Sequence, residues 1–403
     1  MKFDESLLYN IKSDYRGIRY SLFDLAIWKN GIAFKKIDFS DKGLPVIKIA
    51  ELNNGISSNT SFTQGDYGKE FFVQWDDLLF SWSGNPQTSI DVFRYRLPDG
   101  WLNQHIFKVT ANSELVTKDF LYYTLKYLKP YFTQIAINKQ TTGLGHVTIA
   151  DLKRMSVVIP KKEIQEQVTS ILKVIDDKIE VNSNINENLE QQAQAIFANE
   201  FLSLESLPDG WKRGSLIDIA DYLNGLAMQK YRPAADEVGI PVLKIKELRQ
   251  GCCDATSELC SPNIKTNYII HDGDVIFSWS GSLLVDFWCG GTCGLNQHLF
   301  KVTSSEYDKW FYYAWTKHHL ERFIAVAADK ATTMGHIKRD ELSKAEVLIP
   351  NEADYNRIGS LLHPIYDLII TNRIESKNLA ETRDTLLPKL MSGEIDISEV
   401  DYE

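Results

Sequence analysis

Two histidines in a repeated tripeptide are the first residues in this sequence whose types and spacing could do chemistry. Asn103-Gln104-His105 returns as Asn296-Gln297-His298, and each tripeptide leads into a strand-like run. Because imidazole can act as a general base near neutral pH, a hydrolase that uses His105 or His298 is one hypothesis. A polar corner that enters a strand is more often a hydrogen-bonded structural element, and we favour that interpretation.

The cysteines offer a second kind of chemistry, a zinc site. All of them lie in the second half of the chain, at Cys252, Cys253, Cys260, Cys289 and Cys293. Four thiolates can hold zinc, but the spacing is loose and the first half has no cysteine. An odd number without a secretion signal indicates reduced thiols. We therefore expect no metal, with a four-cysteine zinc site as the alternative.

The sequence lacks the short motifs of common enzymes. It has no phosphate-binding loop, no dinucleotide-binding glycine pattern, no H-E-x-x-H and no G-x-S-x-G elbow. We therefore expect a protein that is not itself an enzyme and that binds no cofactor of its own.

The elements that must position these residues occur twice. Four segments recur in the same order at offsets of 190 to 197: residues 44–52 and 240–248, 77–84 and 274–281, 103–110 and 296–303, and 145–160 and 335–350. In each copy, strand-like runs such as 45–49, 77–81 and 105–109 accompany an amphipathic helix such as 119–128. This order predicts a duplicated, mixed α/β globular domain.

The side chains that recur belong to the shared scaffold. They are Trp82 and Trp279, His105 and His298, and His146 and His336. A tryptophan at such a turn either stacks on a nucleic-acid base or packs the turn against the core. Identity between the copies favours packing.

Each copy ends in a long amphipathic helix. Apolar residues follow at spacings of three and four after Glu163 and again after Ile358. About 38 residues would make a rod of about 57 Å, so we expect the two helices to pair. Asn182 and Asn372 interrupt both stripes at one place, either as buried register-fixing residues or as surface residues beside the seam. Pro364 is expected to kink the second helix.

The predicted fold class is α+β. We expect two repeated globular α/β domains, separated by two long antiparallel helices that form a coiled-coil spacer with pseudo-two-fold symmetry. The predicted boundaries are domains at 1–160 and 207–350, a first helical spacer at 161–206, and a second spacer with the C-terminal tail at 351–403.

The charge is distributed unevenly. The formal net charge is −10, a value that by itself argues against nucleic acid as a partner. Residues 161–206 and 351–403 together carry −11, so the two globular domains sum to +1. DNA is therefore not excluded. No apolar run reaches the about 18 residues that a membrane span needs, and Met1-Lys2-Phe3-Asp4-Glu5 has no signal-peptide pattern. We expect a cytoplasmic protein with no membrane partner.

The chain resembles the specificity (S) subunits of type I restriction-modification systems over nearly its whole length. The resemblance is carried by Gly55 and Gly251, the Phe-Ser-Trp-Ser-Gly pair, the Asn-Gln-His pair, the Gly-His to Ile-Pro passages and the segment 386–395. It implies two target recognition domains that bind a bipartite double-stranded DNA sequence, one half each. It also implies methyltransferase (M) subunits, two of them, which use S-adenosylmethionine, and restriction (R) subunits, which use ATP.

Two alternatives stay open beside this interpretation. One is the recognition subunit of a related system with fused methylation and cleavage activities. The other is a coiled-coil scaffold whose twin domains bind proteins instead of DNA.

Residues that read the target should lie where the two copies diverge, because residues common to both cannot encode two different half-sites. The divergent stretches are 53–74, 85–102, 130–141, 249–272, 282–295 and 320–331. Basic and amide side chains make the useful contacts to bases and phosphates. The candidates for DNA binding are Lys69, Arg94, Arg96, Asn138, Lys139, Arg249, Lys265, Arg322 and Lys330. The target bases and the length of the gap between half-sites do not follow from the sequence.

Overall fold

The fold was analysed in a computed structural model, which describes residues 17–140, 143–329, 337, 339–395 and 397. Two compact units account for it. Unit 1 comprises residues 1–176 and 382–403, and unit 2 comprises residues 177–381. Both boundaries lie inside long helices, so each unit contains a part of both helices.

Unit 1 begins with an alternation of strands and short helical turns. Its elements up to the last strand of the main sheet are β1 (Gly17–Ser21), η2 (Leu22–Leu25), β2 (Ala26–Asn30), η3 (Lys36–Asp38), β3 (Leu44–Ile47), α1 (Ile49–Asn54), β4 (Phe62–Thr63), β5 (Phe72–Val73), β6 (Leu78–Ser81), β7 (Ser83–Gly84), β8 (Asp91–Arg94), β9 (Gly100–Leu102) and β10 (Ile106–Ala111). Four helices and two short strands then follow, namely α2 (Lys118–Tyr127), α3 (Lys129–Asn138), β11 (Gly145–His146), α4 (Ile149–Arg154), β12 (Ser156–Pro160) and α5 (Lys162–Phe197).

Two four-stranded sheets form most of unit 1, beside the two-stranded pairings β1-β12 and β7-β11. An antiparallel sheet has the order β2-β10-β6-β8, and a mixed sheet has the order β4-β3-β9-β5 with β3 and β9 parallel. Leu78 and Phe80 of β6 share a core with α2 and α3, whose buried side chains include Phe120 and Phe132. Burial of several aromatic side chains at one place dominates the stability of such a core.

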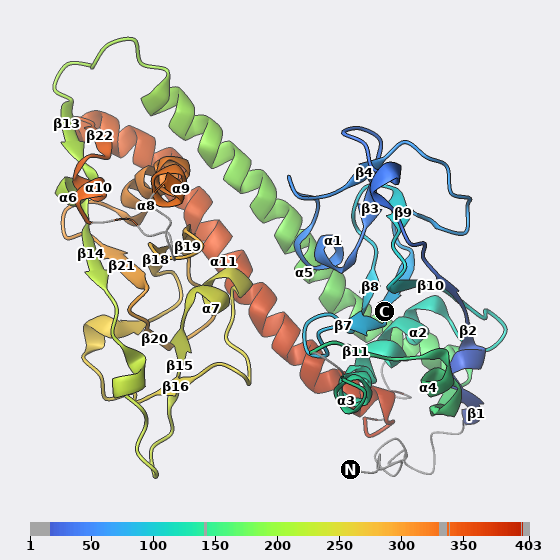
Figure 1. Cartoon of the computed structure of the whole chain (residues 1–403). Coiled ribbons are helices and arrows are strands. Elements are labelled where there is room, and N and C mark those ends of the chain that lie inside the picture. The colour runs from blue at the N-terminus through green and yellow to red at the C-terminus, as the bar shows by residue number, and fades with distance from the viewer. Residues whose placement is uncertain (1–16, 141–142, 330–336, 338, 396, 398–403) are drawn as a thin grey trace. The chain divides into compact units, whose positions relative to one another are not determined.

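Unit 2 repeats this order (Figure 1). It contains a π-helical turn (Ala198–Leu202), β13 (Lys212–Ser215), α6 (Leu216–Ile219), β14 (Asp221–Asn224), η5 (Met228–Lys230), β15 (Ile240–Leu243), α7 (Ile245–Gln250), β16 (Leu259–Cys260), η6 (Thr266–Tyr268), β17 (Ile269–Ile270), β18 (Val275–Ser278), β19 (Leu284–Phe287), β20 (Cys293–Leu295) and β21 (Leu299–Thr303). After these come α8 (Lys309–His318), α9 (Leu320–Asp329), α10 (Arg339–Ser343), β22 (Glu346–Ile349) and α11 (Glu352–Met391).

The sheets of unit 2 have the same orders as those of unit 1. The sequence β14-β21-β18-β19 matches β2-β10-β6-β8, and β16-β15-β20-β17 matches β4-β3-β9-β5. The predicted duplication of an α+β unit is therefore confirmed. The helix expected at 119–128 is α2, whereas the strand expected at 45–49 ends at Ile47, because α1 begins at Ile49.

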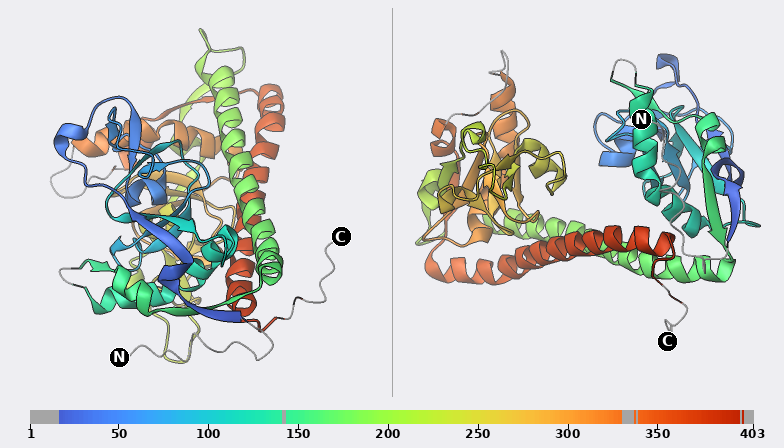
Figure 2. Two further views of the ribbon diagram at one scale, coloured as in Figure 1. Left: turned by 90° about the vertical axis from the view of Figure 1, so that its right-hand side faces the viewer. Right: turned by 90° about the horizontal axis from the view of Figure 1, so that it is seen from below.

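The long helices α5 and α11 have 36 and 40 residues, and within unit 2 they run side by side (Figure 2). Asn182 contacts Glu375, whereas Asn186, later in α5, contacts Ile369, which comes earlier in α11. The two helices are therefore antiparallel there. The helix α11 continues through Pro364 without ending.

The asparagines of the helix pair are buried, so the interpretation as surface residues is wrong. Asn182 is 1% exposed and Asn372 is 7% exposed. Asn372 donates to Asn186 Oδ1 over 2.9 Å, and Asn182 donates to Glu375 Oε2 over 2.7 Å. A buried polar pair of this kind is satisfied in one register only, which disfavours sliding of one helix along the other.

Candidate nucleic-acid interface

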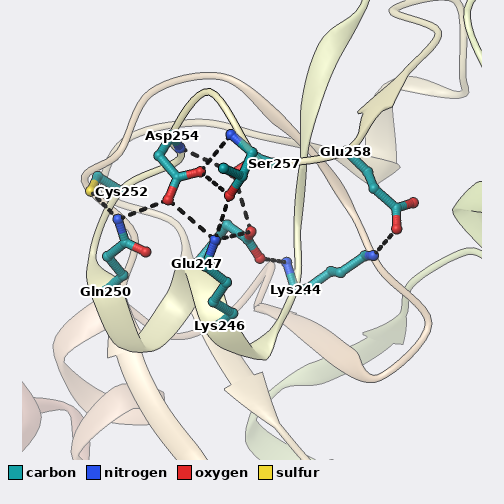
Figure 3. Close-up of polar contacts among 9 residues, drawn as sticks. Lys244, Lys246, Glu247, Gln250, Cys252, Asp254, Ser257 and Glu258 are labelled. Atoms are coloured by element: carbon teal, nitrogen blue, oxygen red, sulfur yellow. Dashed lines mark hydrogen bonds and ion pairs between the residues drawn. The ribbon is translucent and has the colours of Figure 1, made fainter. Parts of the chain in front are cut away.

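A buried glutamate holds the first variable loop of unit 2. Glu247, in α7, is 3% exposed. Its carboxylate accepts one hydrogen bond from the backbone N–H of Lys244 over 3.2 Å and one from the hydroxyl of Ser257 over 3.1 Å. Figure 3 shows the loop between them folded over the helix. The carboxylate thus caps the start of α7 and holds the far end of the loop that follows this helix, in a divergent stretch.

Unit 1 uses the same anchor. Glu51, in α1, accepts from the Lys48 N–H over 3.0 Å and from the Thr60 hydroxyl over 3.1 Å. Gly55 and Gly251 follow the two helices with φ of 78° and 75°, a region that glycine adopts without a steric penalty. The frame around the loop is therefore common to both units.

The loops themselves differ in charge and contacts. In unit 2, Asp254 accepts hydrogen bonds from Lys246 and Gln250 (Figure 3). It also accepts one from the Thr256 hydroxyl. The Thr256 hydroxyl, followed by the other donors, lowers the pKa of Asp254 well below its usual range. Unit 1 has Ser57 at this place, because the Ser57 N–H donates to the Thr60 hydroxyl as the Asp254 N–H donates to the Ser257 hydroxyl. Its loop carries no charged residue between Glu51 and Asp66. The loop is thus a variable element on a constant frame.

The repeated tryptophans lie half-buried at one end of the main sheet. Trp82 Nε1 donates to Asn30 Oδ1 over 2.8 Å, and Trp279 Nε1 donates to Asn224 Oδ1 over 2.9 Å. Each indole also packs on the phenylalanine of the neighbouring strand, Phe107 in unit 1, with ring centroids 5.7 Å apart. Both rings thus pack against the main sheet.

The repeated histidines lie beside the same tryptophans. His105 is exposed and its ring lies 5.6 Å from that of Trp82, while His298 is half-buried. Each contacts the preceding glutamine, with Gln104 Nε2 3.2 Å from His105 Nε2. His146, in β11, pairs with Ser83 across the β7–β11 ladder. His336 lies outside the described residues.

Four of the candidate DNA-binding cations form ion pairs inside their own unit. Arg94 Nη2 lies 2.7 Å from Asp119 Oδ1, although the two groups are not in hydrogen-bond geometry. The guanidinium of Arg94 also lies over the ring of Tyr122. Arg96 pairs with Asp76 over 2.8 Å, Lys139 pairs with Asp151, and Arg322 pairs with Glu341 over 3.4 Å.

These pairs shift the pKa of their carboxylates. Burial acts to raise the pKa of Asp151, but the hydrogen bonds from Lys139 and Thr148 outweigh it and lower that pKa to about 2. Asp76 follows the same pattern, because Lys118 and Arg96 lower its pKa against the effect of burial. Lys139, Lys118 and Arg96 are thus engaged in ion pairs within unit 1.

Four of the remaining candidates are exposed, namely Lys69, Arg249, Lys265 and Asn138. Among the described residues, none forms an ion pair with Lys69, Arg249 or Lys265. Asn138 is exposed at the end of α3 and accepts a hydrogen bond from Gln134 over 3.1 Å. Lys330 lies outside the described residues. The structure therefore leaves Lys69, Arg249, Lys265 and Asn138 accessible from solvent on their own units.

The cysteines are free thiols, and three of them are buried. Burial raises the pKa of Cys260 and of Cys289 to about 11, so both stay protonated at neutral pH. Within the described part of the chain, no three His, Cys, Asp or Glu side chains are grouped so that they could hold a metal ion. No helix there is long and apolar enough to cross a membrane.

Comparison with known families assigns both units. The model of the type I restriction modification DNA specificity domain matches residues 19–191 and again residues 208–381. The chain belongs to this family. It is a specificity subunit of the type I restriction-modification class, with two target recognition domains, and we use that name for the globular parts of units 1 and 2.

Known specificity subunits are similar along most of their length. The MjaIX subunit of Methanocaldococcus jannaschii is 26% identical over 312 residues, which cover 71% of each chain. The HindI subunit of Haemophilus influenzae is 21% identical and covers 75% of this chain and 84% of its own. The crystal structure of the type I S subunit from M. genitalium has a TM-score of 0.54 at 15% identity and covers 94% of this chain and 97% of its own. This last likeness shows that the fold is shared.

Sequence reasoning missed the asparagines that face the tryptophans. Asn30 and Asn224 are exposed and lie at equivalent ends of β2 and β14. A signal was available, because both stand 52 to 55 residues before a repeated tryptophan. The surrounding residues differ too much between the copies for that signal to stand out.

Proposed function

We propose that the chain binds a bipartite double-stranded DNA target, with one half-site for each recognition domain, and that it recruits methyltransferase and restriction subunits to that target. The observation that carries this proposal is the repeated frame with non-identical loops. Glu51 and Glu247 anchor their loops by the same contacts, while the loop residues between the anchor points differ. Two different loops on one frame suit two different half-sites.

The proposed protein does no chemistry of its own. S-adenosylmethionine would be bound by two methyltransferase subunits and ATP by restriction subunits, in the cytoplasm where the DNA lies. The basic side chains proposed to contact DNA are the exposed ones, Lys69, Arg249 and Lys265, together with Asn138. Their charges lie on near-neutral domains, so we expect weak DNA binding by the isolated chain and stronger binding by the assembled complex.

Co-expression with a methyltransferase subunit encoded beside it tests this proposal. We expect a stable complex that protects one two-part sequence in a footprint and methylates adenine within it. Methylation that stops when either recognition domain is exchanged would support one half-site for each domain. A complex that protects no DNA at low salt, or a chain that binds no such subunit, would contradict the proposal. A neighbouring gene that fuses methylation and cleavage would instead place the chain in the related fused class.

A further inference from the structure

A groove of about 1020 Å³ lies beside β14 in unit 2. Its floor is formed by β14, β21 and Trp279, and its rim by η6 and the start of α10. We name it the β14 groove. The side chains that matter for its chemistry are Asn224 on the floor, and Thr266, Asn267 and Arg339 on the rim.

The amide of Asn224 has a fixed orientation in this groove. An indole N–H can only donate, and Trp279 Nε1 lies 2.9 Å from the side-chain oxygen of Asn224. The oxygen is therefore the atom that faces the indole, and Nδ2 with its two N–H groups faces away from it. Among the described residues, none accepts a hydrogen bond from Asn224 Nδ2, and the side chain is exposed. The groove thus presents an oriented donor.

Unit 1 presents the same donor. Trp82 Nε1 lies 2.8 Å from Asn30 Oδ1, so the amide of Asn30 is oriented in the same way. Asn30 pairs with Phe107 across β2 and β10, and Asn224 pairs with Phe300 across β14 and β21. The two amides therefore occupy equivalent positions of the sheet.

The floor carries little net charge in either unit. Lys301 lines the groove, but its ammonium pairs with Asp274 over 2.7 Å. Lys108 pairs with Asp77 over the same distance in unit 1. Asp221 lies at the other end of β14, three residues from Asn224, or about 10 Å along a strand. What the floor offers to an anion is therefore the amide donor.

The rim differs between the units. Lys108 donates to the carbonyl of Phe72, and Lys301 donates to that of Ile269, which sets these two residues as equivalent. Lys69 stands three residues before Phe72 and Thr266 three residues before Ile269, so Lys69 and Thr266 occupy equivalent positions in the two units. The neighbouring positions carry Glu70 in unit 1 and Asn267 in unit 2. A constant floor is thus bordered by a variable rim.

We propose that Asn30 and Asn224 donate hydrogen bonds from Nδ2 to phosphate oxygens of the DNA backbone, one in each half-site. This inference rests on the proposed function. Two half-sites of different sequence share their sugar-phosphate backbone, and contacts to it set the position of a protein on DNA without reading bases. A side chain that is identical and identically oriented in both domains suits that shared element.

Replacement by aspartate tests the two amides. In Asn30→Asp and Asn224→Asp, a carboxylate oxygen still accepts from the tryptophan, but the N–H donor is replaced by an anionic oxygen that repels phosphate. For the complex assembled with its methyltransferase subunit, we expect each variant to bind DNA about tenfold more weakly. The loss should be equal on cognate and non-cognate duplexes, so the ratio between them stays as in the wild type.

Asn188→Asp is the matched control. It introduces the same charge on an exposed part of α5 in unit 2, outside the groove, and it should leave DNA affinity unchanged. Equal melting temperatures of Asn224→Asp and the wild type would show that the fold is intact.

Three results would overturn the inference. Wild-type affinity in both aspartate variants would show that the amides do not touch DNA. A changed ratio between cognate and non-cognate DNA would make them base contacts. Weaker assembly with unchanged DNA affinity of the complexes that form would make the groove a surface for a protein subunit. A wild-type complex that binds no DNA would overturn the proposed function and this inference together.

Discussion

Arg94 in the first recognition domain and Phe287 in the second occupy equivalent strand positions but have opposite chemistry. Arg94 pairs with Leu78 across β6 and β8, and Phe287 pairs with Val275 across β18 and β19. Around Arg94 lie Asp76 and Asp119, whereas Phe287 stacks on Tyr313 with ring centroids 3.9 Å apart.

The turn next to these positions differs in the same way. Asp76 has a φ of 71°, and the equivalent Gly273 has a φ of 84°. In the first domain the Asp76 carboxylate forms ion pairs with Arg96 and Lys118. In the second domain the equivalent residue is Gly273, which has no side chain. The same backbone arrangement is thus stabilised by ion pairs in the first domain and by aromatic packing in the second. Divergence between the copies therefore marks alternative packing as well as target recognition.

Truncation of buried side chains near the ends of the long helices should give the largest difference in stability between the two units. Phe201 is 2% exposed and packs against Trp211 and Trp315 of unit 2, and Leu390 is 2% exposed in the core of unit 1. We expect Phe201→Ala to cost about 3–5 kcal/mol and Leu390→Ala about 2–5 kcal/mol. Hydrogen exchange should show the loss in unit 2 for the first variant and in unit 1 for the second. Exchange that rises equally in both units would show that they unfold together.

Removal of the loop anchors should have the next largest effect. Glu51→Ala and Glu247→Ala each leave a buried hydroxyl and a partly buried backbone N–H without this acceptor, at a cost of about 1–3 kcal/mol. Chemical denaturation of the two variants measures this cost. Similar losses would support equivalent frames, and the conservative Glu→Gln variants should recover part of the stability. A loss in one domain only would mean that its loop is held by other contacts.

Exchange of the turn residue should have a smaller effect. Gly273→Ala places a side chain at positive φ and should cost about 1–2 kcal/mol. Gly273→Asp should cost less, because a side chain built there lies near the ammonium of Lys309, which corresponds to Lys118 beside Asp76. Thermal melting of both variants provides the test. An equal loss would show that the carboxylate gains no partner.

The smallest effects are expected from the exposed lysines. Lys69→Ala and Lys265→Ala should each weaken DNA binding by the assembled complex several-fold and reduce the salt slope of log K by about 0.9. Arg94→Ala should instead lower the stability of unit 1, because Asp119 loses the nearer of its two cationic partners, Arg94 and Lys173. Titration at several salt concentrations, beside thermal melting, separates the two behaviours. An unchanged salt slope for both lysine variants would exclude them as phosphate contacts.

The sequence predicts the duplication, the strands of the main sheets and the long helices, because these depend on local periodicity and on order along the chain. It does not predict which basic residues are available to DNA. Arg94 ends β8 and Arg96 follows it, and in the sequence both look like surface residues. Asp76, Asp119 and Tyr122 approach them only in the folded domain. Ion pairing between distant residues has no periodic signal.

Burial of the asparagines was also beyond the sequence. A polar residue in an apolar stripe is compatible with the seam or with its edge. The choice became clear only when Asn186 was found within 2.9 Å of Asn372. The oriented amides of Asn30 and Asn224 went unnoticed for the related reason that their significance lies in a contact to tryptophan over 50 residues away.

The division of the chain into units has a consequence for the order in which it folds. Unit 2 is continuous in sequence, from 177 to 381, whereas the core of unit 1 includes Leu387, Leu390 and Met391. During synthesis the second domain can therefore close first. The domain whose sequence leaves the ribosome earliest must wait for the last residues of α11 before its core is complete.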